Sequence, residues 1–347
     1  MGWDLRHGYF GALFHGTGVA FYVSMPPVDV VIVNHNTRDL LRDCLRSVRC
    51  EAPREVVVVD NASSDGSAEM VHTEYPWAVL HSNKTNVGYG TAANQGIASC
   101  TAKYVLLLNA DTLLPTGSLQ ALSTYLDEHP GAAVLGPRLV NMDGALQASC
   151  YPFPGTFRWI FDNDDIGFLF HCIPVLRNRF LRTWPHTHAR VVPWVKGAAL
   201  ALRREAFEDV SGFDESFFLY FEETDLCHRL KTVGWQTHFA PVTTITHIGE
   251  ASVVQRCADM MVQLAASNML FCQRHYSPMR AIGLAMIMKI TMVMRLIRDA
   301  IRLNNAREPA KSARIAADVE AWQRVLLGQW RESITYSSQK TVQPDDL

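Results

Sequence analysis

Apolar runs and helical segments alternate along the first part of the chain. Predominantly apolar runs at 28–33, 55–60, 77–81 and 103–108 predict strands, and the first two are typical of strands buried on both faces. The segments that follow them, 37–48, 67–73, 88–99 and 115–129, are expected to be helices. Strands separated by helices of this length indicate parallel βαβ units. The predicted fold class is therefore α/β, with a mostly parallel central sheet flanked by helices.

The rhythm of the chain changes after Ala132. Segments 132–140, 145–150 and 191–203 are expected to be strands, 205–210 a short helix, and 235–240 and 243–247 two short strands that close the domain. The Pro- and aromatic-rich segment 151–190 is typical of a lid or an acceptor surface. The pattern predicts one domain over 28–252, preceded by an extension, 1–27, that lies outside the fold.

Helical patterns dominate the remaining region, 253–347. Residues 280–302 combine an apolar run with Arg280, Arg295, Arg298 and Arg302 on one side of the helix. This combination is typical of a helix on an anionic membrane surface, and equally of a helix that packs on the domain and exposes an ordinary solvated face. The apolar run is shorter than the roughly 20 residues that a membrane-spanning helix needs. The polar tail, 333–347, is expected to be disordered.

Charge and cysteine content narrow the class of protein. The formal net charge is −2, whereas a nucleic-acid-binding protein usually carries an excess of basic residues. No nucleic-acid partner is therefore expected. Eight cysteines are scattered without a C-x-x-C pair, which indicates free thiols in a reducing compartment rather than disulfides or a zinc site. We therefore expect a cytoplasmic protein.

Acidic residues follow two of the predicted strands, at the edge where open α/β sheets bind ligands. Asp60 can accept hydrogen bonds from a nucleobase or a ribose; a solvated turn residue is the alternative reading. Asn109 and Asp111 can hold Mg²⁺ or Mn²⁺ against a diphosphate, since hard cations take oxygen ligands. One carboxylate supplies too few ligands for a divalent cation, so a second protein ligand is expected. His247, which ends the last predicted strand, is the best candidate for a second ligand, with a structural role as its alternative.

A later segment concentrates aromatic and acidic side chains. The aromatic run 217–221 leads directly into Glu222 and Glu223, with Asp225 close behind. Aromatic bulk beside acids predicts a partly desolvated pocket, in which a carboxylate pKa rises and the group can accept a proton near neutrality. A helix start would explain the same acids, because negative charge suits the positive end of the helix dipole. Asp225 and Arg229 are spaced i, i+4 and are expected to form a supporting ion pair.

One motif points to a different chemistry. The segment 88–93, Gly-Tyr-Gly-Thr-Ala-Ala, fits the G-x-G-x-x-A fingerprint of dinucleotide-binding domains, and Asp111 lies about twenty residues downstream as a ribose-binding acid would. However, residues 82–87 separate the strand from Gly88, whereas the fingerprint needs its first glycine in the turn itself. An NAD(P)-dependent oxidoreductase is therefore the weaker alternative.

Taken together, the motifs resemble those of family 2 glycosyltransferases with the GT-A fold, in the rhamnosyltransferase-like branch. The matching segments are 30–36 (VVIVNHN), 57–67 (VVVDNASSDGS), 86–90 (NVGYG) with 94–96 (NQG), 107–112 (LLNADT), 197–200 (GAAL), and 212–229, ending at His247. They cover roughly residues 28–252, and their order and spacing make the resemblance specific.

The resemblance implies a role for each matching residue. The expected nucleotide-sugar site comprises Asn34, His35, Asp60, Gly88, Asn94, Asn109 and Gly197; the expected metal ligands are Asp111 and His247; the expected catalytic residues are Glu223 and Glu222. Glu223 matches the catalytic base, which is usually aspartate in the family, and Glu222 is the neighbour that shapes its pKa or contacts the acceptor. Asn109 replaces the first aspartate of the metal-binding D-x-D motif.

The implied function is an inverting, metal-dependent transfer of a sugar by single displacement. The expected donor is dTDP-rhamnose, and the expected acceptor is a lipid-linked or cell-surface glycan. The implied partners also include the inner face of the cytoplasmic membrane, as a peripheral contact, while a homodimer stays open. A non-catalytic nucleotide-sugar-binding module on the same fold is the remaining alternative.

Overall fold

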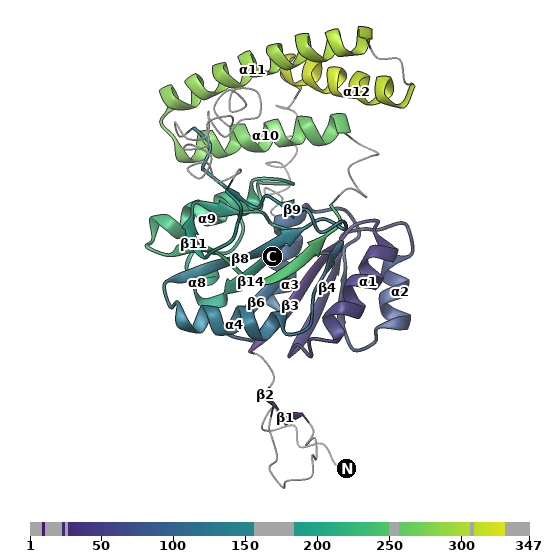
Figure 1. Cartoon of the computed structure of the whole chain (residues 1–347), viewed down its shortest axis with the longest axis vertical. Helices are drawn as coiled ribbons and strands as arrows, with labels where there is room; N and C mark the ends of the chain where they lie inside the picture. The colour runs from purple at the N-terminus through teal and green to yellow at the C-terminus, as the bar shows by residue number, and fades with distance from the viewer. Residues whose placement is uncertain are drawn as a thin grey trace, which may run out of the picture.

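We analysed the protein as a computed structural model, which describes residues 9–10, 23–24, 27–155, 184–249, 257–305 and 309–329. The predicted disordered tail and most of the predicted lid segment fall outside the described residues. The short strands β1 (Tyr9–Phe10) and β2 (Val23–Ser24) pair only with each other. They lie at the opposite end of the molecule from the C-terminal helices (Figure 1).

A ten-stranded sheet forms the centre of the domain, in the order β11-β14-β8-β13-β6-β3-β4-β5, with β7 paired to β14 and β9 to β8. Its parallel half contains β3 (Val28–Asn34), β4 (Glu55–Asp60), β5 (Val79–Ser82) and β6 (Tyr104–Asn109). Every residue of β3 is buried, as its predominantly apolar sequence predicts. The parallel βαβ half of the predicted fold is confirmed.

The second half of the sheet is mixed rather than parallel. It contains β7 (Thr112–Leu113), β8 (Ala132–Val140), β9 (Leu146–Gln147), β11 (Arg190–Val192), β13 (Ala199–Arg203) and β14 (Gln236–His247). Strand β13 runs antiparallel to both β6 and β8, whereas β14 runs parallel to β8.

Two sequence predictions need correction in this half. The run predicted as one strand over 191–203 is three pieces: β11, β13 and, between them, β12 (Trp194–Val195), which pairs with β10 (Cys150–Tyr151) in a separate ribbon. The two short strands predicted near 240 are a single strand, β14, with an irregular register between Phe239 and Thr244. Both departures depend on pairing partners far away in the sequence, which local periodicity does not encode.

Helices cover both faces of the sheet (Figure 1). On one face, α1 (Arg38–Arg49), α2 (Ser67–Glu74) and α4 (Ser118–Glu128) bury apolar side chains against one set of strand residues. On the other face lie α3 (Tyr89–Ala98), α8 (Arg204–Asp209) and α9 (Glu222–Thr232). The three layers leave the carboxyl ends of the parallel strands as the edge where a ligand can bind.

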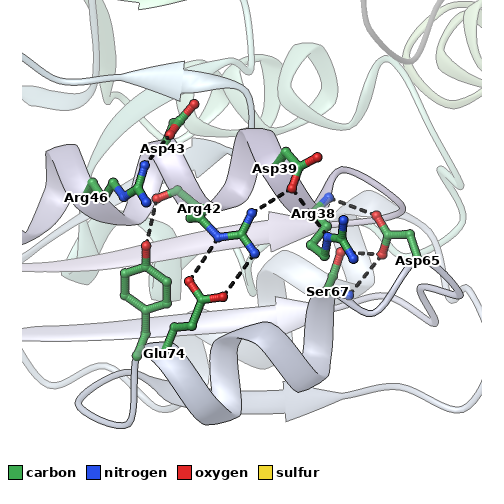
Figure 2. Close-up of polar contacts among 9 residues, drawn as sticks. Arg38, Asp39, Arg42, Asp43, Arg46, Asp65, Ser67 and Glu74 are labelled. Carbon is green, nitrogen blue, oxygen red and sulfur yellow. Dashed lines mark hydrogen bonds and ion pairs between the residues drawn. The ribbon is translucent and has the colours of Figure 1, made fainter.

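A surface network joins α1 to α2 and to the turn after β4 (Figure 2). Arg42 forms a fork of two hydrogen bonds to Glu74, at 2.9 and 3.0 Å, and also donates to Asp39. Asp65 accepts from the backbone N–H groups of Arg38, at 2.8 Å, and Ser67, at 3.0 Å. The turn that follows Asp60 is thereby anchored to the start of both helices.

Three further helices form a layer above the sheet domain: α10 (Cys257–His275), α11 (Pro278–Asn305) and α12 (Pro309–Leu326) (Figure 1). Phe271 of α10 and Leu284 of α11 belong to the same buried cluster as α3 and α9. The first part of α10, the middle of α11 and the last turns of α12 form a small core of their own around Trp322. Within the described part of the chain, none of the helices has the length and apolarity needed to cross a membrane.

Candidate active site

A pocket of about 470 Å³ lies at the carboxyl edge of the parallel strands. Its lining comes from the ends of β3, β6 and β14, the loop before α3, residues 218–220 before α9, and Met260 of α10. Of the residues predicted from the sequence, the lining includes His35, Gly88, Asn109, Asp111 and His247. The other predicted residues, Asn34, Asp60, Asn94, Gly197, Glu222 and Glu223, are not part of this lining.

Asn34 and Asp60 lie buried behind the pocket and shape one end of it. The Asn34 side-chain amide donates to Asp60 Oδ1, at 2.8 Å, and Asp60 Oδ2 accepts from the backbone N–H of Ser63, at 3.0 Å. Thr37 precedes α1 without capping it; its hydroxyl donates to Asn34 Oδ1 instead, at 2.6 Å. These bonds fix the loops that follow β3 and β4.

His35 and Asn61 form the pocket surface at this end. His35 Nδ1 lies 2.9 Å from the carbonyl oxygen of Asn61. The buried Asn61 amide donates to Asn86 Oδ1, at 2.8 Å, and to the Gly88 carbonyl oxygen, at 3.1 Å. Asn61 and Asn86 line the pocket but were not among the predicted residues. Their signal in the sequence is their place within the two matching segments, beside Asp60 and Gly88.

The glycines of the dinucleotide-like fingerprint serve packing. The φ of Gly88 is +92°, a conformation that favours glycine. A Cβ at Gly88 would lie 2.7 Å from the Phe218 carbonyl oxygen, and one at Gly90 would lie 3.3 Å from Phe213. Both glycines therefore let α3 approach the segment before α9. The geometry argues against a dinucleotide cradle and thus against the oxidoreductase alternative.

Asp111 and His247 meet although 136 residues separate them in the chain. Strand β7 pairs with the end of β14, which brings His247 Nε2 to 3.3 Å from Asp111 Oδ1. The backbone N–H of Gly249 donates to Asp111 Oδ2, at 3.0 Å. Burial opposes ionisation of Asp111, but its bonds to His247 and Gly249 outweigh burial and lower its pKa below the ordinary value.

Gln147 and Lys196 determine which nitrogen of His247 faces Asp111. Lys196 Nζ donates to Gln147 Oε1, at 3.1 Å, and the Gln147 amide donates to Asn141 Oδ1, at 2.8 Å. Gln147 Oε1 is therefore an acceptor, so His247 Nδ1–H must donate to it, at 2.6 Å. The Nε2 atom is left facing the Asp111 carboxylate.

This pair fits a divalent cation. A proton between Nε2 and Oδ1 gives the hydrogen bond that lowers the pKa of Asp111. Without that proton, two acceptor atoms only 3.3 Å apart repel each other unless a cation lies between them. A histidine whose second nitrogen is held by a hydrogen bond is the usual form of a metal ligand. Among the described residues no cluster of three or more His, Cys, Asp or Glu is available, so the remaining ligands would come from substrate phosphates and water, as is common for Mg²⁺.

Glu222 and Glu223 begin α9 beside the pocket wall. Gly197 N–H donates to Glu223 Oε1, at 3.3 Å, and the Gly197 carbonyl oxygen accepts from the hydroxyl of Tyr89, at 3.3 Å. Burial raises the pKa of both carboxyl groups, and the charge of Glu223 raises the pKa of Glu222 further. Glu223 ionises first, because the Gly197 N–H and the charge of Lys196 favour its carboxylate.

Glu223 has the features expected of a base. Its Oε2 atom is buried, as is that of Glu222, and no side chain or backbone group of the described residues hydrogen-bonds to either atom. Buried polar atoms without a partner are rare in folded proteins and call for an explanation. A hydroxyl group of a substrate would supply the missing partner and is the group from which a base takes its proton.

The aromatic run before α9 divides into a core part and a pocket part. Phe217 is buried in the core, whereas Phe218, Leu219 and Tyr220 line the pocket. Tyr220 and Phe221 have φ values of +66° and +68°, in the left-handed region that bulky residues rarely adopt. Such strain persists where surrounding contacts enforce it, and it is common at functional sites.

Asn94 and Asp225 have structural roles. The Asn94 amide donates to the Phe213 carbonyl oxygen, at 3.0 Å, and its Oδ1 accepts from Phe213 N–H, which fastens α3 to the segment before α9. Asp225 is 1% exposed and pairs with Arg229, at 2.6 Å, and with His275 of α10, at 2.6 Å. The predicted Asp225–Arg229 pair is confirmed, but it is buried and reaches a third element.

Lys196 and Gln147 are the site residues that sequence reasoning missed. Lys196 lines the pocket directly before Gly197, and it forms no ion pair with a carboxylate of the described chain. Its signal in the sequence is a lone cation between the apolar runs of two strands. Gln147 carries no such signal, because its partners His247 and Lys196 are 100 and 49 residues away.

The mixed sheet, the helices on both faces and the pocket that Asp111 lines at the carboxyl edge are those of a GT-A type glycosyltransferase. The sequence profile of "Glycosyl transferase family 2" matches residues 29–184. Residues 29–184 therefore match glycosyltransferase family 2, and the protein is a glycosyltransferase.

Named relatives and a solved structure agree with this assignment. The N-acetylglucosaminyl-diphospho-decaprenol L-rhamnosyltransferase of Mycobacterium tuberculosis is 27% identical over 282 residues, which cover 76% of this chain and 89% of the relative. The rhamnosyltransferase WbbL of Escherichia coli is 22% identical over 232 residues, covering 63% and 83%. The mannosyltransferase PcManGT from Pyrobaculum calidifontis, solved with GDP-Man and Mn²⁺, superposes with a TM-score of 0.52 at 17% identity, covering 93% of this chain and 89% of that one.

Proposed function

We propose that this glycosyltransferase moves rhamnose from dTDP-rhamnose to a hydroxyl group of a lipid-linked or cell-surface glycan, with inversion at the anomeric carbon. The observation that carries the proposal is the meeting of Asp111 and His247 in one pocket with Lys196, next to Glu223. The choice of rhamnose is supported by the names of the two bacterial relatives. A lipid-linked acceptor is supported by the decaprenol compound in the name of the first.

The residues of the pocket divide the work of the reaction. His35 and Asn61 are placed to contact the nucleoside, beyond the Asn34–Asp60 bond that holds their loops. Asp111 and His247 would hold Mg²⁺ or Mn²⁺, which when bound neutralises charge on the leaving diphosphate. Glu223 takes the proton from the acceptor hydroxyl as that oxygen attacks the anomeric carbon. A single displacement of this kind needs no covalent nucleophile.

Lys196 is placed to contact the diphosphate. Burial lowers the pKa of its ammonium group, whereas the charges of Asp111 and Glu223 act in the opposite direction and favour the cation. Among the described residues, Lys196 donates its hydrogen bond to the neutral amide of Gln147 and forms no ion pair. An incoming phosphate oxygen would therefore be the first anionic partner of Lys196.

Replacing Lys196 by methionine should weaken binding of dTDP by about tenfold or more, the usual effect of losing a hydrogen bond to a charged group. Binding of thymidine, which lacks the phosphates, should change little. Isothermal titration with both ligands measures the difference. Lys103→Met is the matched control, because Lys103 directly precedes β6 and does not line the pocket. Equal losses for dTDP and thymidine would instead show that Lys196 only supports the fold.

A panel of nucleotide sugars tests the proposed donor. In thermal unfolding with and without Mn²⁺, dTDP-rhamnose should raise the melting temperature most, because a ligand that binds only the folded state stabilises it by mass action. The rise should be larger with Mn²⁺. Stabilisation by NAD(P)H but by no nucleotide sugar would overturn the proposal. Slow hydrolysis of the bound donor would further exclude a non-catalytic binding module.

The free thiols of the described cysteines suit a reducing compartment, which supports a cytoplasmic location. The oligomeric state stays open, as it was from the sequence. Contact with the membrane is a separate proposal, because it depends on α11 rather than on the pocket.

A further inference from the structure

Helix α11 exposes a continuous apolar stripe. Seven of its apolar side chains, at intervals of one to four residues, are between 42% and 60% exposed: Ile282, Met286, Ile290, Val293, Met294, Ile297 and Ile301. At 100° per residue these positions fall within one sector of the helix. The helix has 28 residues, so the stripe extends along much of a rod about 42 Å long.

The opposite side of α11 is also apolar, and it is this side that packs on the protein. Ala281, Leu284, Met288 and Met292 are buried there against α10 and α12. The packing of the domain is therefore complete without the exposed stripe. Contiguous exposed apolar surface of this kind usually marks an interaction site.

Cations lie along both edges of the stripe. Lys289 is exposed on one edge, and Arg298 lies on the other edge, with Arg302 one turn further along. Asp299 is the acid of this helix; it is buried, and both arginines share it, at 2.9 and 3.4 Å. The arginine side chains still keep exposures of 41% and 60%. The rim of the stripe is thus positively charged.

The arginines of α11 do not all face outward, although the helical pattern places them on one side of the helix. Arg280 donates to the Gly155 carbonyl oxygen, at 2.9 Å, and Arg295 lies over the ring of Trp322, at 5.0 Å. These two arginines therefore contact the protein, while apolar residues form the outward face. The arginine cluster is not itself the outer surface.

We infer that the outer face of α11 lies in the interface of an anionic lipid bilayer, with the helix parallel to the membrane plane. A cationic rim complements anionic headgroups, and an apolar stripe enters the boundary with the acyl chains. The seven stripe residues are flexible or branched aliphatic side chains without an aromatic anchor. Protein interfaces are enriched in Trp, Tyr and Arg at their centres, so the composition suits fluid lipid better than a shaped protein partner.

The position of α11 agrees with this orientation. It is the outermost helix of the C-terminal layer, at the far end of the molecule from β1 and β2 (Figure 1). Helix α10 lies between α11 and the sheet domain and contributes Met260 to the pocket lining. A membrane on the outer face of α11 would therefore lie on the same side of the domain as the pocket.

Vesicle co-sedimentation of the full chain, without any nucleotide sugar, tests the inference independently of the proposed function. The protein should bind mixed vesicles of phosphatidylcholine and phosphatidylglycerol, bind pure phosphatidylcholine weakly, and dissociate as salt is raised. The double substitution Ile290→Glu with Ile297→Glu should lower the partition coefficient by about tenfold or more. Lys289→Gln should lower it by about fivefold.

Met142→Glu is the matched control, because Met142 is an exposed apolar residue far from α11 in the sequence and outside the stripe. It should bind vesicles as the unaltered chain does. Binding that is equal for both lipid mixtures and insensitive to salt would overturn the inference. So would a stable dimer in solution that the double substitution converts to monomer while vesicle binding is unchanged, since a second copy would then cover the stripe.

Discussion

Replacing Glu223 by glutamine is expected to lower kcat for sugar transfer by about 100- to 10,000-fold, the usual contribution of a general base. Glutamine keeps the size of the side chain and can still accept from the Gly197 N–H, at 3.3 Å in the unaltered protein, but it cannot take a proton. Binding of dTDP should be nearly unchanged. Steady-state kinetics together with titration of dTDP separates the two effects.

Two other substitutions sharpen this test. Glu215→Gln, on the exposed part of the same segment, should retain activity. Glu223→Asp restores the residue usual in the family and keeps a carboxylate, so its activity should be intermediate. Full activity in Glu223→Gln would remove Glu223 from the role of base.

The pH profile should report the same group. A base works as its carboxylate, so activity falls as pH falls through its pKa. Because burial raises the pKa of Glu223 above the ordinary 4.5, the acid limb of kcat/KM should lie above that value. The limb should be absent from the residual activity of Glu223→Gln.

Replacing Asp111 by asparagine should abolish the dependence of donor binding on Mn²⁺. The change keeps the shape of the side chain but removes the charge that faces His247, at 3.3 Å. The loss of Mn²⁺ affinity should exceed the roughly 10- to 100-fold cost of altering a group that only supports a ligand. Mn²⁺ titration followed by electron paramagnetic resonance measures it without any turnover.

Gln147→Leu provides the comparison for that experiment. It removes the acceptor that orients His247 Nδ1 but leaves both proposed ligands, so its effect should fall within the 10- to 100-fold range. Asp143→Asn, at an exposed turn, should bind Mn²⁺ as the unaltered protein does. Unchanged Mn²⁺ affinity in Asp111→Asn would place the cation elsewhere.

Local pattern was enough to predict the parallel half of the sheet. The predominantly apolar run of β3 predicts a strand buried on both faces, and the positions of Asp60 and Asp111 follow from the ends of such strands. The mixed half of the sheet was harder to predict, because β13 is antiparallel to two strands that are distant in the sequence. Strand direction there depends on the path of the chain between strands, which periodicity does not contain.

The candidate site shows the same division. The meeting of Asp111 with His247 was expected from the need for a second metal ligand and from the resemblance between motifs, and the structure brings them together. Lys196 and Gln147 belong to no motif, and their importance appears only when β9, β12 and β14 converge. The left-handed backbone at Tyr220 and Phe221 was also beyond prediction, because neither residue type favours it.

The packing of α10 bears on how this chain can be divided. Phe271 is fully buried between Phe153 and Phe221, with ring centroids at 6.3 and 5.9 Å, and His275 pairs with the buried carboxylate of Asp225. A chain shortened near residue 252 would lose an aromatic side chain from its core, at about 3–5 kcal/mol, and leave a buried acid with one partner fewer. The shortest fragment that keeps this core intact must therefore include α10 and the first turns of α11. Exchanging the C-terminal helices between relatives would exchange part of the catalytic domain's interior with them.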